Sequence, residues 1–150
     1  MPKIKLFLDS SALISGIISA DGAARALLLL AETGHVEIKV SLQVVAETER
    51  TIARKAPRAV GDYRRAIQAA KVRILRDPEA EEVRSHLHLI AHAADAPILL
   101  AAMHAKVDYL VTLNRKHFID DPGVAEKAGI RIGTPGDALG WVRDRLSKYE

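Results

Sequence analysis

A short, almost continuous apolar run near the N-terminus constrains the fold of this chain more than any other feature. The run Ile4–Leu8 (IKLFL) is rich in strand formers, is too short for a helix and is followed directly by Asp9. Runs of this kind are typical of a strand that is buried on both faces, as in a parallel sheet covered by helices. We therefore expect an α/β fold in which Ile4–Leu8 is the first strand.

Strand-like and helix-like segments alternate along the rest of the sequence. The further predicted strands are Val36–Val40, Val72–Leu75, Asp108–Val111 and Gly129–Ile132. The predicted helices are Ala23–Ala31, Leu42–Lys55, Arg58–Ala70, Glu79–Ala91, Asp95–Ala105 and Asp137–Lys148. Such alternation predicts parallel strands joined by right-handed crossovers. The sequence has no internal repeat, low-complexity tract or linker, so we expect a single domain over residues 1–150.

The composition excludes several classes of protein. Hydrophobic residues make up 49% of the 150 residues and charged residues 27%, which is the balance of a globular domain rather than of a disordered chain. The absence of cysteine excludes disulfide scaffolds, thiolate zinc sites and thiol catalysis. The longest apolar run, Ala96–Met103, has eight residues, whereas a membrane span needs roughly 18. We expect a cytoplasmic protein that has no membrane partner.

Positive charge is concentrated in one part of the chain. Residues 50–76 contain nine basic residues and a single acid, Asp62, although the net charge of the whole chain is only +3. Cations gathered in this way attract phosphate backbones, because each cation that meets a phosphate releases a condensed counterion. The alternative is a solvated helical face that only keeps the protein soluble. The candidate nucleic-acid contacts are Arg50, Arg54, Lys55, Arg58, Arg64 and Arg65.

Oxygen-bearing side chains occur close to the predicted strand ends. Asp9 follows the first strand, Glu47 lies on the helix after the second, and Asp95 opens the helix that precedes the fourth. Thr112 and Asn114 follow that fourth strand. The functional crevice of an open parallel sheet lies beyond the carboxyl ends of its strands. Carboxylate and amide oxygens are ligands that Mg²⁺ and Mn²⁺ prefer, and clustered carboxylates repel one another unless a cation neutralises them.

Each of these acids also has a purely structural interpretation. Asp9 and Asp95 are both placed to cap the helix that follows them. Glu47 competes with Glu49, because residues two apart on a helix point to nearly opposite sides and only one of them can face the crevice. The spacing from Ser41 favours Glu47.

The histidines and one further aspartate also have both a functional and a structural interpretation. His88 and His92 have the i,i+4 spacing that can share a metal ion on a helix, but no further ligand accompanies them, which favours surface histidines. His117, close to Asn114, either contacts a substrate phosphate or packs at the sheet edge. Asp108 begins its strand at the end remote from the crevice, so we expect it to be structural.

Four segments together resemble the PIN-domain ribonucleases, and most closely the VapC-type toxins and their stand-alone relatives. They are DSSALIS from Asp9, SLQVVAE from Ser41, DAPILLAAM from Asp95 and VTLNRKHF from Val111. None of these segments is specific alone, whereas all four in this order, extending from the first strand to residue 118, are a strong signal.

The resemblance implies a three-layer α/β fold whose five-stranded parallel sheet has the order 3-2-1-4-5 and is flanked by helices. It implies an endoribonuclease that hydrolyses RNA phosphodiester bonds with Mg²⁺ or Mn²⁺. The catalytic and metal-binding residues would be Asp9, Glu47, Asp95 and Asn114. Ser11 and Thr112 would hydrogen-bond these carboxylates or bound water and so fix their orientation. Family members commonly form homodimers and are often toxins held inactive by an antitoxin, so both partners are expected here.

Asn114 is the main departure from the family pattern, which usually has aspartate at this position. An amide carbonyl can still bind Mg²⁺, but the pocket loses one negative charge and would hold a second ion more weakly. The alternative function is therefore a catalytically weakened RNA-binding or regulatory module of the same fold.

Overall fold

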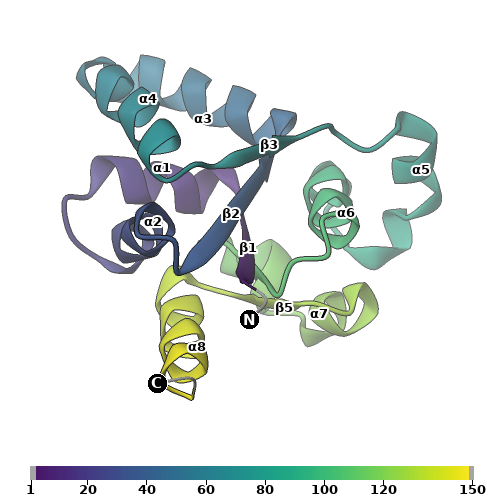
Figure 1. The fold of residues 1–150 in the computed structure, drawn as a ribbon. Coiled ribbons are helices and arrows are strands. Elements are labelled where there is room, and N and C mark those ends of the chain that lie inside the picture. Colours follow the sequence, from purple (N-terminus) through teal and green to yellow (C-terminus); the bar gives the residue numbers. More distant parts are fainter. Residues whose placement is uncertain (1–2, 149–150) are drawn as a thin grey trace.

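The computed structural model describes residues 3–148 and contains one five-stranded parallel sheet. The strands are β1 (Ile4–Leu8), β2 (Val36–Ser41), β3 (Arg73–Leu75), β4 (Tyr109–Val111) and β5 (Arg131–Gly133). Their order is β3-β2-β1-β4-β5, and every neighbouring pair is parallel (Figure 1). The expected fold class and strand order are thus confirmed. Strand β1 occupies the centre, where Leu6, Phe7 and Leu8 are fully buried.

Two groups of helices cover the sheet (Figure 1). The first group packs around α1 and consists of α1 (Ser10–Ile18), α2 (Ala23–Glu32), α3 (Leu42–Lys55), α4 (Val60–Ala69) and, beside α2, α8 (Pro135–Ser147). The second group packs around α6 and consists of α5 (Ala80–Ser85), α6 (Ala96–His104) and α7 (Pro122–Ala128). Short turns join these elements: η1 (Pro57–Ala59), η2 (Leu87–Leu89), η3 (Ala93–Asp95) and η4 (Arg115–Ile119).

The helix predicted over Glu79–Ala91 is shorter in the structure. Helix α5 ends at Ser85, and a separate turn, η2, follows it. The cause is local: the Ser85 hydroxyl donates to the carbonyl of Glu82 (2.9 Å), and Nδ1 of His86 also lies 2.7 Å from that oxygen. Side-chain groups of this kind compete with the backbone donors that would continue a helix.

Helix α7 and the irregular start of α4 are not among the elements predicted from the sequence. Helix α7 begins after Asp121, which caps it, has Pro122 at its first position and ends at Gly129 in the left-handed conformation. These are ordinary start and stop signals, but the helix is too short to show an apolar period. The predicted helix Arg58–Ala70 is divided into the turn η1 and α4.

Helices α1 and α2 approach each other closely at Gly16. A Cβ atom at this position would lie 2.7 Å from Cδ1 of Leu28 and 3.2 Å from the carbonyl oxygen of Ala24. The absence of a side chain therefore permits this contact. Among residues 3–148, no single helix is both long and apolar enough to cross a membrane, and α1 and α2 pass that test only as a pair bent by 87°.

Candidate active site

Asp9 lies at the carboxyl end of the central strand and begins α1. Its Oδ1 accepts hydrogen bonds from the Ala12 backbone N–H (3.0 Å) and from the Ser11 hydroxyl (2.7 Å). Its Oδ2 accepts a hydrogen bond from the Thr112 hydroxyl, at the end of β4. The residue is 7% exposed. Asp9 thus does cap a helix, as its structural interpretation requires, and it is also anchored at the sheet edge where a ligand would bind.

The electrostatic setting of Asp9 is unfavourable for a lone carboxylate. Burial raises the pKa of this carboxyl group above its ordinary value of 3.8, and the charge of Asp95 raises it as well. Hydrogen bonds from Thr112, Ser11 and the Ala12 N–H act in the opposite direction and lower the pKa. Among the ion pairs within residues 3–148, none involves Asp9. The part of the chain described here therefore supplies no cationic side chain to balance this buried acid.

Glu47 is brought to the same edge of the sheet by α3. Its Oε2 accepts from the hydroxyl of Ser10, the residue after Asp9, at 2.9 Å, and its Oε1 accepts from Nε2 of Gln43 at 2.9 Å. Glu49 is exposed on the other side of the helix and accepts a hydrogen bond from the Tyr63 hydroxyl (3.2 Å). The structure thus places Glu47, and not Glu49, beside the end of β1.

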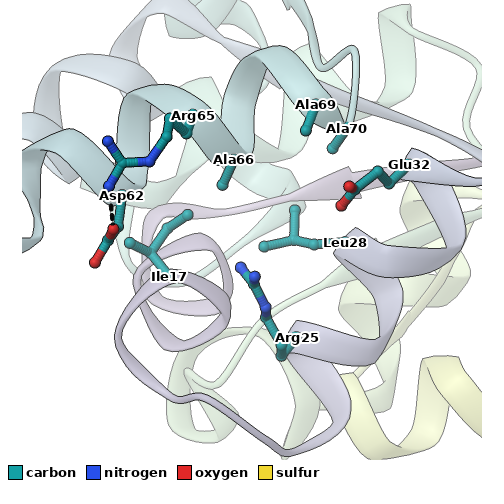
Figure 2. A pocket seen from close by; sticks show the side chains of 9 residues that line it. All are labelled: Ile17, Arg25, Leu28, Glu32, Asp62, Arg65, Ala66, Ala69 and Ala70. Carbon is teal, nitrogen blue, oxygen red and sulfur yellow. Dashed lines mark hydrogen bonds and ion pairs between the residues drawn. The ribbon is translucent and has the colours of Figure 1, made fainter.

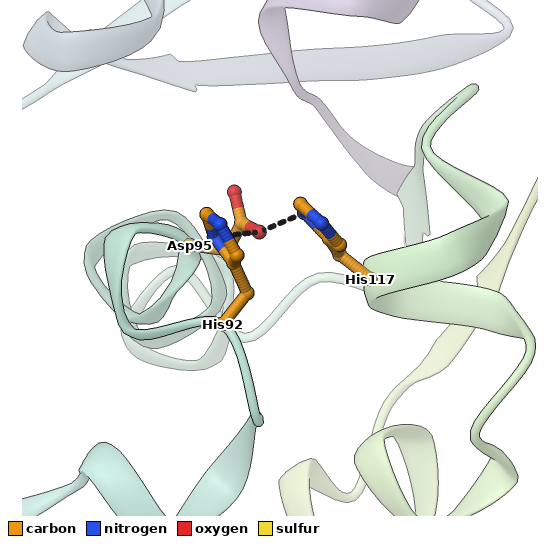
Figure 3. A group of neighbouring side chains, drawn as sticks. All are labelled: His92, Asp95 and His117. Carbon is orange, nitrogen blue, oxygen red and sulfur yellow. Dashed lines mark ion pairs between the residues drawn. The ribbon is translucent and has the colours of Figure 1, made fainter.

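Asp95 reaches the site from the second group of helices. It precedes α6, but its side chain makes no capping hydrogen bond. Its Oδ2 lies 2.7 Å from Nδ1 of His117 and 3.2 Å from Nδ1 of His92 (Figure 3). Because its charge acts on the pKa of Asp9, the two carboxylates lie in one electrostatic neighbourhood.

Asn114 and the two hydroxyl residues form a connected network. The Thr112 hydroxyl, which donates to Asp9, accepts from the Asn114 N–H (3.0 Å), and Ser11 Oγ accepts from the Leu113 N–H (3.0 Å). Asn114 begins η4, and its Oδ1 accepts from the backbone N–H of His117 (3.2 Å). The amide is therefore fixed in orientation, and its carbonyl oxygen keeps a second lone pair for a further partner.

The predicted ligands lie at one edge of the sheet, but the tightest group of possible ligand atoms there contains only one of them, Asp95. Among residues 3–148, the group of histidine and carboxylate ligand atoms that lie within 4.8 Å of one another consists of His92, Asp95 and His117, without Asp9 or Glu47. The i,i+4 spacing suggests a pair of His92 with His88, whereas in the structure His92 stacks on His117. The sequence places His92 three residues before Asp95 and His117 three residues after Asn114, but nothing in it indicates that the two histidines meet.

The six basic residues predicted to contact nucleic acid are all exposed on α3, η1 and α4. Arg50 and Arg54 follow Glu47 by three and seven positions, so they share its face of α3. Arg65 differs from the others because it forms an ion pair with Asp62, at 2.5 Å.

A cavity of about 380 Å³ lies between α1, α2 and α4 (Figure 2). Its polar lining is balanced in charge, with Arg25 and Arg65 against Glu32 and Asp62, over a floor that includes Leu28. None of the four predicted metal ligands lines it. A second cavity, of about 420 Å³, adjoins the candidate site, and its lining is Ala91, His92, Lys116, His117, Asp121 and Val124.

Residues 5–116, which include every predicted metal ligand, match a family model described as PIN domain. This chain belongs to the PIN domain family. PIN domains are generally nucleases, and the predicted family resemblance is confirmed. None of the curated proteins matches the sequence.

Two solved structures show that this PIN domain shares its fold with distant relatives. PAE2754 from Pyrobaculum aerophilum is 17% identical, with a TM-score of 0.58, over 94% of this chain and 96% of that one. A structure of VapBC2 from Rickettsia felis, bound to a DNA fragment from their promoter, is 18% identical with a TM-score of 0.61. That match covers 87% of this chain and 98% of the other. At these identities the likeness establishes the fold.

Proposed function

We propose that this PIN domain is a cytoplasmic endoribonuclease that hydrolyses RNA with Mg²⁺ or Mn²⁺, and that it is the toxin of a toxin–antitoxin pair. The observation that carries the proposal is the buried carboxylate of Asp9, which lies in the field of Asp95 and forms no ion pair with any residue in 3–148. A divalent cation is the partner that such a pair of acids lacks.

The residues present fit a hard divalent ion. Asp9, Glu47 and Asp95 would hold it directly or through water, and the free lone pair on the carbonyl of Asn114 would add a neutral oxygen. A bound ion supplies an activated water and stabilises negative charge on the phosphate. The protein's own contribution is orientation. Ser11 and Thr112 fix Asp9, and the hydroxyl of Ser10 fixes Glu47, before any ligand binds.

The exposed arginines of α3 would guide RNA to these acids. Arg50 and Arg54 lie on the face of α3 that carries Glu47, the second of them about 10 Å along the axis from it. In this position they would bind backbone phosphates on one side of the cleavage point. Lys55, Arg58 and Arg64 extend the positive surface away from the site, whereas Arg65 is already paired with Asp62.

The likeness to a VapBC structure supports an antitoxin as the protein partner. Expression of the wild-type chain alone should arrest bacterial growth, and Asp9→Asn should relieve the arrest. A homodimer is expected from the family resemblance, and the mass of the protein in solution tests it.

The decisive experiment is a set of RNA digests with Mg²⁺, with Mn²⁺ and with a chelator. Asp9→Asn is the main variant, because asparagine retains the helix cap but removes the charge. Asp144→Asn, which makes the same change on the exposed face of α8, is the matched control. We expect wild type and Asp144→Asn to cleave with either ion and not with chelator. Asp9→Asn should still bind RNA but lose cleavage.

Cleavage that persists unchanged in Asp9→Asn would contradict the proposal and would point to a contaminating nuclease. Wild-type protein that binds RNA without cutting it under any of these conditions would support the alternative, a binding or regulatory module of the same fold.

A further inference from the structure

The imidazole rings of His92 and His117 stack against each other at the candidate site (Figure 3). Their centroids are 3.9 Å apart and their planes differ by 14°. His92 lies just before η3 and His117 lies in η4, so the pair joins the segments on either side of α6 and β4. Both rings turn Nδ1 toward the same atom, Oδ2 of Asp95.

The hydrogen bonds around Nδ1 of His117 conflict. Oδ1 of Asn114 accepts from the backbone N–H of His117, so the NH₂ end of that amide faces Nδ1, at 3.0 Å. A donor in this position requires a lone pair on Nδ1. Asp95 Oδ2 lies 2.7 Å from the same nitrogen and would require a proton there. One nitrogen atom cannot meet both requirements.

Oδ2 of Asp95 is itself an unsatisfied atom. It is inaccessible to solvent, and within residues 3–148 it has no hydrogen-bond partner of acceptable geometry, although two imidazoles lie close to it. Buried carboxylate oxygens are rarely left in this state. A cation between Oδ2 and the two Nδ1 atoms would bind one lone pair from each of the three atoms, so that no proton would be needed between Asp95 and either ring.

We propose that His92, Asp95 and His117 form a binding site for a divalent first-row transition metal ion of the Zn²⁺ and Co²⁺ class. Two imidazoles and one carboxylate are the donor set that such ions favour, whereas Mg²⁺ prefers oxygen alone. Bond lengths of about 2.0–2.2 Å separate neighbouring donors by about 3.3 Å. The three donors already lie within 4.8 Å of one another, and His92, whose side chain is 52% exposed, has room to adjust.

The surroundings leave such an ion accessible. Both histidines line the cavity of about 420 Å³, together with Lys116 and Asp121. A fourth coordination position would open into this space for water or for a phosphate oxygen, whose charge Lys116 would complement. The site does not depend on the proposed nuclease activity. Because Asp95 is common to both, however, an ion held here would also alter the proposed magnesium site.

Metal binding tests the site directly, without any activity measurement. Untagged protein is titrated with Co²⁺, followed by its visible absorption, and with Zn²⁺, followed by calorimetry. We expect His92→Ala and His117→Ala each to weaken Co²⁺ binding by more than the about 10-fold typical for loss of an outer-sphere partner. His88→Ala removes an exposed histidine outside the cluster and should leave the affinity unchanged. A large excess of Mg²⁺ should not displace Co²⁺.

Further variants separate this site from the acidic site of Asp9. Asp9→Asn should lose RNA cleavage but keep Co²⁺ binding, and His117→Gln, which preserves polarity and approximate size, should fold and yet lose Co²⁺ binding. Unaltered Co²⁺ affinity in the double variant His92→Ala/His117→Ala, or equal competition by Mg²⁺, would overturn the proposal. A protein that cleaves RNA but binds no Co²⁺ would also overturn it and would leave the nuclease proposal intact.

Discussion

The hydroxyl of Thr112 donates a hydrogen bond to Oδ2 of Asp9 and so joins the ends of β4 and β1. A backbone bond from the Asp9 N–H to the carbonyl of Val111 (3.1 Å) runs beside it. Thr112 is fully buried and also accepts from the Asn114 N–H. The acid at the centre of the candidate site is therefore oriented by the fold itself.

Thr112→Val should destabilise the protein. The substitution keeps the shape of the side chain but leaves a buried carboxylate oxygen and the Asn114 N–H without their partner, at a cost of about 1–3 kcal/mol. Denaturant unfolding measures the change.

Thr48→Val on α3 is the matched control, because its hydroxyl is buried and unpaired among the described residues. Removing an unpaired polar atom should leave the stability unchanged or raise it by about 1 kcal/mol. Equal losses of stability in the two variants would show that the Thr112 hydroxyl has no special role.

Glu47→Gln and Glu49→Gln should each change a different property of the protein. Burial and the adjacent Glu49 raise the pKa of Tyr63 to about 12, so Glu49→Gln should lower this pKa while leaving metal binding unchanged. Glu47→Gln should weaken Mg²⁺ binding and leave the pKa of Tyr63 unchanged. Ultraviolet titration against a Tyr63→Phe reference reports the first effect and calorimetry the second. If Glu49→Gln lost Mg²⁺ binding and Glu47→Gln did not, the assignment of Glu47 to the metal site would be wrong.

Arg50→Ala and Arg54→Ala should weaken RNA binding and its dependence on salt. Each phosphate contact that is lost on a single strand should reduce the slope of log affinity against log salt by about 0.7. Arg143→Ala, an exposed charge on α8, should leave the slope unchanged. Equal effects of all three substitutions would indicate general charge attraction rather than a binding face on α3.

Gly16→Ala should destabilise the contact between α1 and α2, because its methyl group would meet Leu28 and the carbonyl of Ala24. A loss of about 1–3 kcal/mol is expected from this overpacking. Gly140→Ala, which meets nothing within 4 Å on α8, should instead stabilise by about 0.5–1 kcal/mol through helix propensity. Thermal unfolding of the two variants distinguishes these outcomes. A Gly16→Ala protein as stable as wild type would contradict the close packing of α1 against α2 at this position.

The capping box of α8 should give a pH-dependent contribution to stability. Hydrogen bonds from Thr134 lower the pKa of Asp137 below its ordinary value of 3.8. The unfolded chain therefore takes up the proton first, and the contribution is complete well above that value and declines as the pH falls through the folded pKa. Asp137→Asn should be less stable than wild type at neutral pH, and the difference should shrink in acid. A pH-independent difference would exclude this mechanism.

Local patterns were enough to predict most of the fold. The run Ile4–Leu8 indicated a buried strand, because a strand that is buried on both faces has an almost entirely apolar sequence. The helical spacing from Ser41 predicted correctly that Glu47, and not Glu49, faces the end of β1, where it contacts Ser10. The metal-binding roles of these residues stay predictions.

The pairing of His92 with His117 could not be read from the sequence. It depends on where α5 ends and on the turn after β4, both of which are decided by side-chain hydrogen bonds at single residues. Such contacts cannot be predicted from hydrophobic periodicity, because a hydrogen bond at a single residue produces no repeating pattern in the sequence.

Asp9 caps α1 and is also the proposed metal ligand, and these two roles together restrict which amino acids its position would tolerate. Serine, threonine or asparagine there would still start α1, and glutamate would still carry a charge, but aspartate alone combines the short reach of a cap with an anion. Substitution by asparagine would therefore yield a chain that folds normally but lacks the proposed Mg²⁺ ligand at this position, so a single substitution would remove the proposed nuclease activity without a change in the fold.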